Sequence, residues 1–286
     1  MLKPAGLDRA AVRRAFNARE TAELRADFLL AEAERRLLER LAPMRLPAVA
    51  RVLELGCGLG RSLPLLAQRF PQAVLVALDL AEQPLLAQCR RAQQARRGVQ
   101  GLLARFRGAG SGPLPLWVAG DAHQLPLPAN SVDVIWSNLV FHWLDDPLLA
   151  LAECHRVLRA GGVLLFSAFG VDTGRELRAD SAQALFDRAG LPAGTPWPSL
   201  QDMHDWGDAM MARGFVDPVM DVEHLRLSYR TPEALASDMR ALGLPVSPHA
   251  FVPEVSVELV FGHAWIPAQK TRLDGLAPIH IVRKVL

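Results

Sequence analysis

Short apolar runs and longer amphipathic segments follow one another along most of the chain. The short runs are rich in β-branched and aliphatic residues, and they predict seven strands, at Val52–Leu55, Ala73–Leu78, Leu116–Ala119, Val132–Trp136, Val163–Ala168, Glu223–Tyr229 and Val255–Trp265. The amphipathic segments predict helices over residues 8–42, 63–70, 82–107, 147–158, 179–189, 201–214 and 232–242. This alternation of strands and helices indicates an open α/β sheet.

The junction between the first strand and the next helix carries three alternate glycines, Gly56, Gly58 and Gly60. Glycine has no Cβ, so it tolerates positive φ and lets a ligand lie against the backbone, while the next helix offers free N–H groups. The second strand ends at Asp79, and a carboxylate in that place suits the two hydroxyls of a ribose. Together these features predict a site for a nucleoside cofactor.

The spacing of the turn narrows the choice of nucleoside. A dinucleotide fingerprint reads G-x-G-x-x-G, whereas here the third glycine comes one residue earlier and Glu54 stands two residues before the first. The resulting E-x-G-x-G-x-G resembles the first motif of class I S-adenosylmethionine (SAM) methyltransferases, in which the acid helps to hold the cationic amino-acid end of SAM. Such a turn also occurs without a ligand, but Asp79, about 20 residues later, favours the cofactor.

A second motif of that family follows the third predicted strand. Gly120 to Pro126 read G-D-A-H-Q-L-P and match G-D-A-x-x-L-P, which implies that Asp121 binds the adenine amino group. The resemblance implies a Rossmann-like class I methyltransferase fold, with a seven-stranded, mostly parallel sheet, helices on both faces and a helical insert after strand five. Side chains that follow the fourth strand also line the crevice of such a sheet. We therefore expect SAM to be bound by Glu54, Gly56, Gly58, Gly60, Asp79, Leu80, Asp121, Ala122 and Asn138.

Composition and charge limit the other functions. With 286 residues, half of them hydrophobic, the chain fits one large domain with an appendage; we expect a helical flap at 1–47 and a methyltransferase domain at 48–286, with a substrate-side insert at about 170–214. A net charge of +2 does not suggest a nucleic-acid partner. Three cysteines without a C-x-x-C pair support neither a disulfide framework nor a metal site and fit a cytoplasmic protein. We expect no signal peptide and no membrane span, because the apolar runs are too short.

Six blocks of sequence are more individual than these motifs. They are V-R-R-A-F-N (12–17), S-N-L-V-F-H-W-L-D-D-P (137–147), F-G-V-D-T-G-R-E-L-R (169–178), D-M-H-D-W-G-D (202–208), G-F-V-D-P-V-M-D (214–221) and F-G-H-A-W (261–265). Together they resemble the malonyl-carrier-protein O-methyltransferases of biotin synthesis, over nearly the whole chain. The resemblance implies methyl transfer from SAM to the free carboxylate of a malonyl thioester on acyl carrier protein, with malonyl-coenzyme A as an alternative acceptor.

The sequence departs from that family at two points. The family usually carries a tyrosine in the flap after the R-A-F-N block, whereas residues 18–22 read A-R-E-T-A, and Gly174 stands where a leucine is common. Three alternatives therefore stay open: an arginine hydroxylase similar to a mitochondrial complex I assembly factor of the same fold, a methyltransferase of small molecules such as a ubiquinone precursor, and a SAM-binding protein without catalysis.

The implied chemistry requires anion binding rather than proton removal. A malonyl carboxylate is ionised at pH 7, so an in-line methyl transfer needs positioning and no general base. Arg175 and Arg178 are our candidates for holding this carboxylate, with ordinary surface ion pairs as the alternative. His142, after the fourth strand, is a candidate for a direct chemical role, although a lone histidine is more often a structural partner than a catalyst.

A basic segment at Arg90–Arg107 is a candidate docking surface for an acidic carrier protein, since exposed arginines steer such encounters. Arg13 and Arg14 are rival candidates for this contact. The alternative is that these charges only form a solvated helix face.

Overall fold

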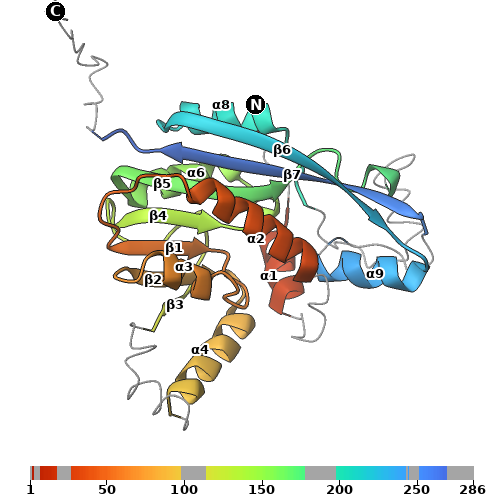
Figure 1. Ribbon diagram of the computed structural model, residues 1–286, viewed down its shortest axis with the longest axis horizontal. Coiled ribbons are helices and arrows are strands. Elements are labelled where there is room, and N and C mark those ends of the chain that lie inside the picture. Colours follow the sequence, from red (N-terminus) through yellow and green to blue (C-terminus); the bar gives the residue numbers. More distant parts are fainter. Residues whose placement is uncertain are drawn as a thin grey trace, which may run out of the picture.

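The computed structural model describes residues 2, 7–17, 27–97, 114–177, 198–242, 244 and 251–268. Within these residues, seven strands form one sheet, made of β1 Arg51–Leu55, β2 Val74–Asp79, β3 Leu116–Ala119, β4 Val132–Ser137, β5 Leu158–Phe169, β6 Val216–Ser228 and β7 Glu254–Trp265. Their order is β3-β2-β1-β4-β5-β7-β6, and β7 runs antiparallel to both of its neighbours (Figure 1). The seven-stranded, mostly parallel sheet predicted from the sequence is confirmed.

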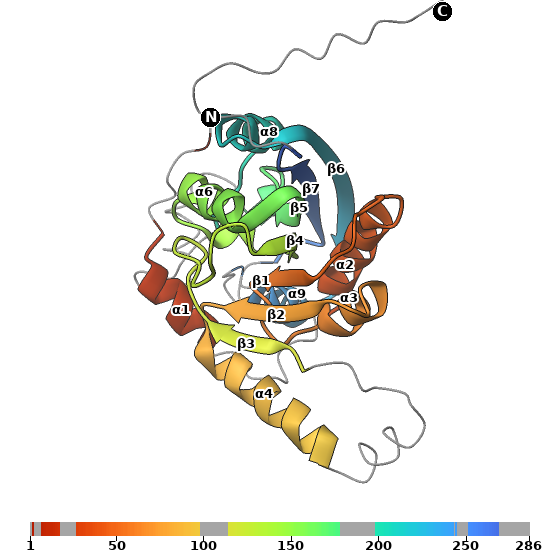
Figure 2. The ribbon, with the colours of Figure 1, turned by 90° about the vertical axis from the view of Figure 1, so that its left-hand side faces the viewer.

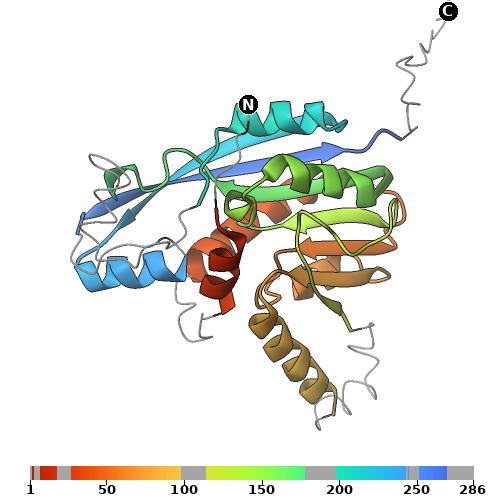
Figure 3. The ribbon, with the colours of Figure 1, turned by 180° about the vertical axis from the view of Figure 1, so that it is seen from behind.

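Helices cover both faces of this sheet, as expected. The helices in the described ranges are α1 Arg9–Asn17, α2 Asp27–Leu41, α3 Leu63–Arg69, α4 Glu82–Arg97, α6 Pro147–Val157, α8 Met203–Ala212 and α9 Pro232–Ala241, with 3₁₀ turns η2 Phe141–Trp143 and η3 Arg175–Leu177. α2, α3 and α9 share one apolar core, whereas α6 and α8 contribute to a second core across the sheet (Figures 2 and 3). In the described part of the chain, none of the helices combines the length and apolar character needed to cross a bilayer.

The central strands position the site. β1 lies between β2 and β4, and all three read as nearly continuous apolar runs because helices cover both of their faces. β1, β2, β3 and β4 are parallel, so the segments that follow them meet at one edge of the sheet. In Figure 1, α1 lies beside this edge.

Two strands are longer than the sequence predicts. β5 begins at Leu158 rather than Val163, and β6 begins at Val216 rather than Glu223. Residues 159–162, which lie between the predicted helix 147–158 and the predicted strand Val163–Ala168, belong to β5. Gly161 N donates to Ile266 O at 3.0 Å and Ile266 N donates to Gly162 O at 2.8 Å. The predicted start of this strand was wrong because a residue distant in sequence, Ile266, pairs with the segment and extends the strand.

Several predictions fall outside the described residues. They include the helical insert at 179–189, the part of the helix 82–107 that lies beyond Arg97, and the link 18–26 within the helical segment 8–42. The division of the chain into a flap at 1–47, a domain at 48–286 and an insert at about 170–214 stays a prediction.

The packing of β7 against β5 can be tested by substituting Gly262. A Cβ on Gly262 would come within 2.5 Å of Phe166 Cε1 on β5, so Gly262→Ala should destabilise the fold by about 1–3 kcal/mol through overpacking. Gly207→Ala in α8 is the matched control, because its Cβ would meet only Met220 Cγ at 3.4 Å; it should stabilise the helix by up to about 1 kcal/mol. Denaturant unfolding measures both, and equal stability of the two variants would contradict this packing.

Candidate functional site

The glycine turn, Gly56–Gly60, is tied to the end of β2 by backbone hydrogen bonds. Gly56 N and Cys57 N both donate to Leu78 O, at 2.8 and 3.0 Å. The Asp79 carboxylate accepts from Gly58 N at 2.7 Å and from Ala81 N at 2.8 Å. The acid predicted to meet a ribose therefore also fixes the turn that would hold the rest of the cofactor.

The three glycines have different roles. All three have positive φ, at +71° for Gly56, +50° for Gly58 and +65° for Gly60. A Cβ on Gly56 would come within 2.3 Å of Val140 Cγ2, whereas one on Gly58 would meet nothing within 4 Å. Gly58 thus leaves open space for a ligand, and Gly56 allows the close approach of the segment after β4.

Gly60 does not belong to the cavity wall. Its N–H closes the turn by donating to Cys57 O at 2.6 Å, and a Cβ there would come within 2.7 Å of Leu63 Cδ1 in α3. The sequence motif groups it with the ligand-facing glycines, but the structure gives it the role of joining turn and helix.

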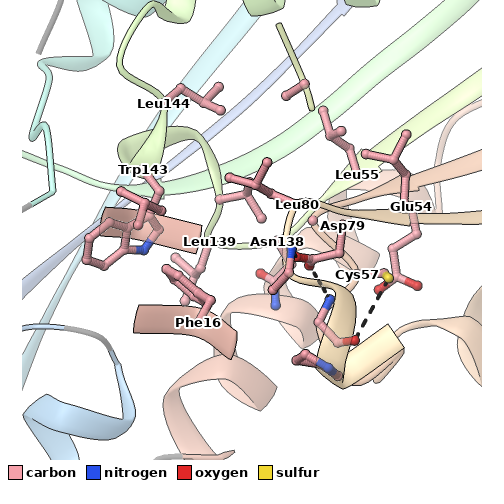
Figure 4. A pocket seen from close by; sticks show the side chains of 18 of the residues that line it. Phe16, Glu54, Leu55, Cys57, Asp79, Leu80, Asn138, Leu139, Trp143 and Leu144 are labelled. Atoms are coloured by element: carbon pink, nitrogen blue, oxygen red, sulfur yellow. Dashed lines mark hydrogen bonds between the residues drawn. The ribbon is translucent and has the colours of Figure 1, made fainter. Parts of the chain in front are cut away.

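A cavity opens where the parallel strands end. Its wall includes most of the predicted site residues, namely Glu54, Gly56, Gly58, Asp79, Leu80, Asp121, Ala122, Asn138 and His142. Figure 4 shows Glu54, Cys57 and Asp79 on one side of this cavity and Phe16 and Trp143 on the other. This is the place where open α/β sheets bind their ligands.

Glu54 is a buried carboxyl group with one oxygen still to be satisfied. Its side chain accepts hydrogen bonds from the Ser62 hydroxyl and backbone N–H, and burial raises its pKa to about 8, with a further contribution from the negative charge of Glu34. Glu54 Oε2 has no hydrogen-bond partner among the residues that the structure describes. A buried acid of this kind favours a cationic ligand, which would stabilise its ionised form.

Asp121 belongs to a closed ring of four charged or polar side chains. Its Oδ1 lies 2.5 Å from His123 Nδ1, and this hydrogen bond lowers the pKa of Asp121 to about 2. His123 Nε2 lies 2.9 Å from Asp145 Oδ1, and Arg9 completes the ring by contacting Asp145 at 2.8 Å and Asp121 at 3.3 Å. The ring fastens α1 against the predicted adenine side of the cavity.

Sequence reasoning missed three members of this ring: Arg9, His123 and Asp145. The D-x-H spacing of Asp121 and His123 is a local signal that could have suggested one contact. The other contacts join residues more than twenty positions apart, and their sequence carries no pattern that pairs them.

Asn138 lines the cavity, but its amide is also used by the protein. Ser167 Oγ donates to Asn138 Oδ1 at 2.7 Å, and Asn138 Nδ2 donates to Leu30 O in α2 at 3.1 Å. The next residue, Leu139, has φ +55° and donates its N–H to Ser167 Oγ at 2.9 Å. Asn138 therefore joins α2 to the sheet, and its contact with SAM stays a prediction.

An apolar wall faces the glycine turn across the cavity. It consists of Phe16, Leu30, Leu139, Trp143 and Phe169. The rings of Phe16 and Trp143 meet edge to face, with centroids 5.3 Å apart, so α1 and η2 form this wall jointly.

His142 is 1% exposed and lines the cavity beside the apolar wall. Its Nδ1 accepts a hydrogen bond from Phe169 N at 3.1 Å, which places the proton of the neutral ring on Nε2. The structure therefore gives His142 a structural bond to β5, and a direct chemical role stays a prediction.

Arg175 does not line the cavity. Its side chain is 53% exposed and pairs with Asp172 at 3.4 Å and with Glu176 at 3.3 Å. Glu176 in turn accepts from Ser256 N at 2.9 Å, which holds this segment on β7. Arg178 lies outside the described residues, so its predicted part in holding the carboxylate is untested.

The comparisons with known proteins agree with this geometry. Residues 53–166 match a family described as a methyltransferase domain. The fold resembles the YcgJ protein from Bacillus subtilis, with a TM-score of 0.54 and 16% identity over 82% of this chain and 98% of the other. It also resembles a phosphoethanolamine N-methyltransferase from Haemonchus contortus in complex with SAM, with a TM-score of 0.54 and 18% identity over 82% of this chain and 52% of the other. The fold and the site define a class I SAM-dependent methyltransferase.

Relatives over the whole chain narrow this class. A malonyl-[acyl-carrier protein] O-methyltransferase from Laribacter hongkongensis is 36% identical over 93% of this chain and 92% of its own length. The enzyme of the same name from a Methylovorus strain is 33% identical over 96% of this chain and 94% of its own. The chain belongs to the malonyl-[acyl-carrier protein] O-methyltransferase family. This membership selects the methyltransferase over the arginine hydroxylase and the non-catalytic protein.

The described residues fit SAM. Glu54 offers a buried, unsatisfied carboxyl oxygen to a cationic group, Gly58 leaves room beside the backbone, and Asp79 ends β2 where a ribose would lie. Asp121 is held in its ionised form, so it can accept a hydrogen bond from an adenine amino group. Every predicted SAM-binding residue except Gly60 lines this cavity.

The raised pKa of Glu54 predicts that SAM binding depends on pH. Below its pKa of about 8 the empty site holds a neutral carboxyl group, and an ammonium group binds the carboxylate better, so binding releases a proton. Affinity for SAM should therefore rise between pH 6 and 7.5, by up to about tenfold per pH unit, while the ammonium of SAM itself stays largely protonated.

Calorimetry across this pH range measures the effect. Glu54→Gln should bind more weakly and lose the pH dependence, whereas Glu39→Gln, on the exposed side of α2, should keep it. A wild-type affinity that stays constant between pH 6 and 7.5 would contradict the raised pKa of Glu54.

Proposed function

We propose that this protein transfers the methyl group of SAM to the free carboxylate of a malonyl thioester on acyl carrier protein, an early step of biotin synthesis. The observation that carries the proposal is the extent of the similarity. The relatives that bear this activity in their names match more than nine-tenths of the chain, including the segments beyond the methyltransferase domain at 53–166. Those segments include the predicted flap at 1–47 and the predicted substrate-side insert at about 170–214.

The cavity suits methyl transfer to an anion. SAM, when bound, would supply a methyl group on a positively charged sulfur. A malonyl carboxylate is ionised at pH 7 and could accept this methyl group directly, with neutral S-adenosylhomocysteine as the leaving group. No residue then has to remove a proton, which agrees with the bond from Phe169 N to His142 Nδ1. The apolar wall has the role of excluding water, so that the carboxylate is not hydrated at the moment of reaction.

Arg13 is a further candidate for the substrate carboxylate. Three arginines line the cavity within the described residues: Arg9, Arg13 and Arg61. Arg13 pairs with Glu82, and both side chains are nearly half exposed, so this ion pair is weak and can give way to a substrate anion. Arg13 stands on α1 one turn before Phe16, next to the apolar wall.

In this proposal the partner is the acyl carrier protein, and the basic segment Arg90–Arg107 is its predicted docking surface. Arg90 and Arg91 are exposed on α4, as a docking surface requires, while the side chains of Arg96 and Arg97 and the rest of the basic segment lie outside the described residues. Docking at Arg90–Arg107 stays a prediction, and malonyl-coenzyme A stays an alternative acceptor.

Substrate identity is tested by incubation with isotopically labelled SAM and three acceptors: malonyl-carrier protein, acetyl-carrier protein and malonyl-coenzyme A. We expect the label in a methyl ester of malonyl-carrier protein, detected by mass analysis, and none in the acetyl control, which has no free carboxylate. A label restricted to a small molecule such as a ubiquinone precursor would refute the proposal. A label on malonyl-coenzyme A alone would show that the acceptor is bound to coenzyme A and not to carrier protein.

The arginine that holds the carboxylate is tested by replacing each candidate with glutamine. Arg13→Gln should raise the KM for malonyl-carrier protein about 10- to 100-fold and leave SAM affinity nearly unchanged, because a charged hydrogen bond to the substrate is lost. Arg226→Gln is the control, since Arg226 is highly exposed on β6 and does not line the cavity. If Arg175→Gln or Arg178→Gln has the large effect instead, the substrate anion lies at the insert.

A further inference from the structure

We propose that Arg61, which follows the glycine turn, binds the α-carboxylate at the methionine end of SAM, and that Glu34 on α2 holds the Arg61 side chain for this contact. The inference rests on SAM-dependent methyl transfer and is independent of the methyl acceptor. It adds a basic residue to a cofactor site in which the sequence predicted none.

The methionine end of SAM carries an ammonium group and a carboxylate on one carbon atom. Glu54 suits the ammonium group, because its Oε2 is buried and lacks a hydrogen-bond partner within the described ranges. The carboxylate beside that ammonium group needs donors of its own, and charged donors make the strongest hydrogen bonds to it. The wall of the cavity should therefore hold a basic group next to Glu54.

Arg61 lies next to Glu54 in this wall. Ser62 donates to the Glu54 carboxyl group from its hydroxyl and from its backbone N–H, and this N–H belongs to the peptide that joins Arg61 to Ser62. Gly60 N closes the preceding turn by donating to Cys57 O at 2.6 Å, so the backbone at Arg61 is fixed from both sides. The residues Glu54, Arg61 and Ser62 all line the cavity.

The other arginines of the cavity lie at a different place. Among the described residues of the wall these are Arg9 and Arg13, both on α1. Arg9 contacts Asp121 at 3.3 Å, on the predicted adenine side, and Arg13 pairs with Glu82 at the start of α4. Arg61 is therefore the arginine of the described wall that stands beside the glycine turn, where the methionine end is expected.

Glu34 holds the guanidinium of Arg61 from inside the protein. Arg61 Nε donates to Glu34 Oε2 at 3.2 Å, and the side chain of Arg61 is 37% exposed whereas that of Glu34 is 6% exposed. Glu34 is absent from the wall of the cavity, but it follows Leu30 of the apolar wall by one turn of α2. Glu34 thus acts on a ligand only through Arg61, as a positioning residue.

One guanidinium can serve two carboxylates. It has five N–H donors in a rigid plane, and the bond to Glu34 engages the one on Nε. A bond at Nε fixes the plane of the group, so less side-chain freedom is lost when a ligand carboxylate binds. Lysine in this place would lack both the plane and the second set of donors.

The test compares two ligands that differ only in the carboxylate. The product S-adenosylhomocysteine carries it, and the decarboxylated analogue has hydrogen in its place but keeps the amino group for Glu54. Calorimetry measures binding of both to the full-length wild type and to the variants Arg61→Gln and Arg69→Gln. Arg69 is the matched control, because it is exposed on α3 and does not line the cavity.

Arg61→Gln should weaken binding of S-adenosylhomocysteine about 10- to 100-fold and change binding of the decarboxylated analogue by no more than about twofold. Arg69→Gln should change neither. If Arg61→Gln weakens both ligands equally, Arg61 acts only on the shape of the turn, and the proposal is overturned. Unchanged binding of S-adenosylhomocysteine overturns it as well, and a raised KM for malonyl-carrier protein in that case would assign Arg61 to the carboxylate of the acceptor.

The positioning role of Glu34 is tested by Glu34→Gln and by the double variant Glu34→Gln, Arg61→Gln. Glu34→Gln should weaken S-adenosylhomocysteine less than Arg61→Gln does and should spare the decarboxylated analogue, because the guanidinium remains but is held less firmly. The double variant should bind like Arg61→Gln, whereas losses that add would show that Glu34 acts independently of Arg61. The double variant also answers a folding defect of Arg61→Gln, since it leaves no buried carboxylate without its partner.

The result is separate from the acceptor, because neither ligand donates a methyl group. Selective loss in Arg61→Gln together with no methylation of malonyl-carrier protein would refute the proposed substrate and leave the role of Arg61 standing. Methylation of malonyl-carrier protein by the wild type together with an equal loss of both ligands in Arg61→Gln would refute the role of Arg61 alone.

Discussion

The burial of Glu54 at the end of the central strand is the constraint on which the site depends. β1 has a neighbour on each side and helices on both faces, so a carboxylate there is shielded from water and must find its partners in the protein or in a ligand. Ser62, the N-cap residue of α3, donates hydrogen bonds to this carboxyl group from its hydroxyl and its backbone N–H. The other oxygen of Glu54 has no partner among the described residues, so a cationic ligand in the cavity would complete its contacts.

The sequence predicted the parts of the fold that have local patterns. The first four strands agree with their predicted ranges to within one residue at each end, because continuous apolar runs bounded by glycine or an acid mark buried parallel strands. The glycine motif and Asp79 were likewise local signals. The extension of β5 was missed because it depends on Ile266, more than a hundred residues away.

The site residues divide in the same way, into those with a local sequence pattern and those without one. Residues at strand ends, such as Glu54, Asp79 and Asp121, could be predicted, since strand order brings them together. The contribution of the N-terminal helix could not be predicted, because nothing in the pattern of α1 shows that Arg9 meets Asp121 or that Phe16 meets Trp143. Gly60 and Arg175 lie outside the cavity wall and have other partners in the protein, so their predicted ligand contacts stay predictions.

The close approach of Gly56 to Val140 has a consequence for how such sequences vary. The two segments come from different loops, yet a side chain at position 56 would occupy the volume of the valine. Substitution at either position is therefore constrained by the other: residue 140 can become large and branched only while residue 56 stays glycine. Among homologous chains these two positions should vary together, which makes them a linked pair within a motif usually described by its glycines alone.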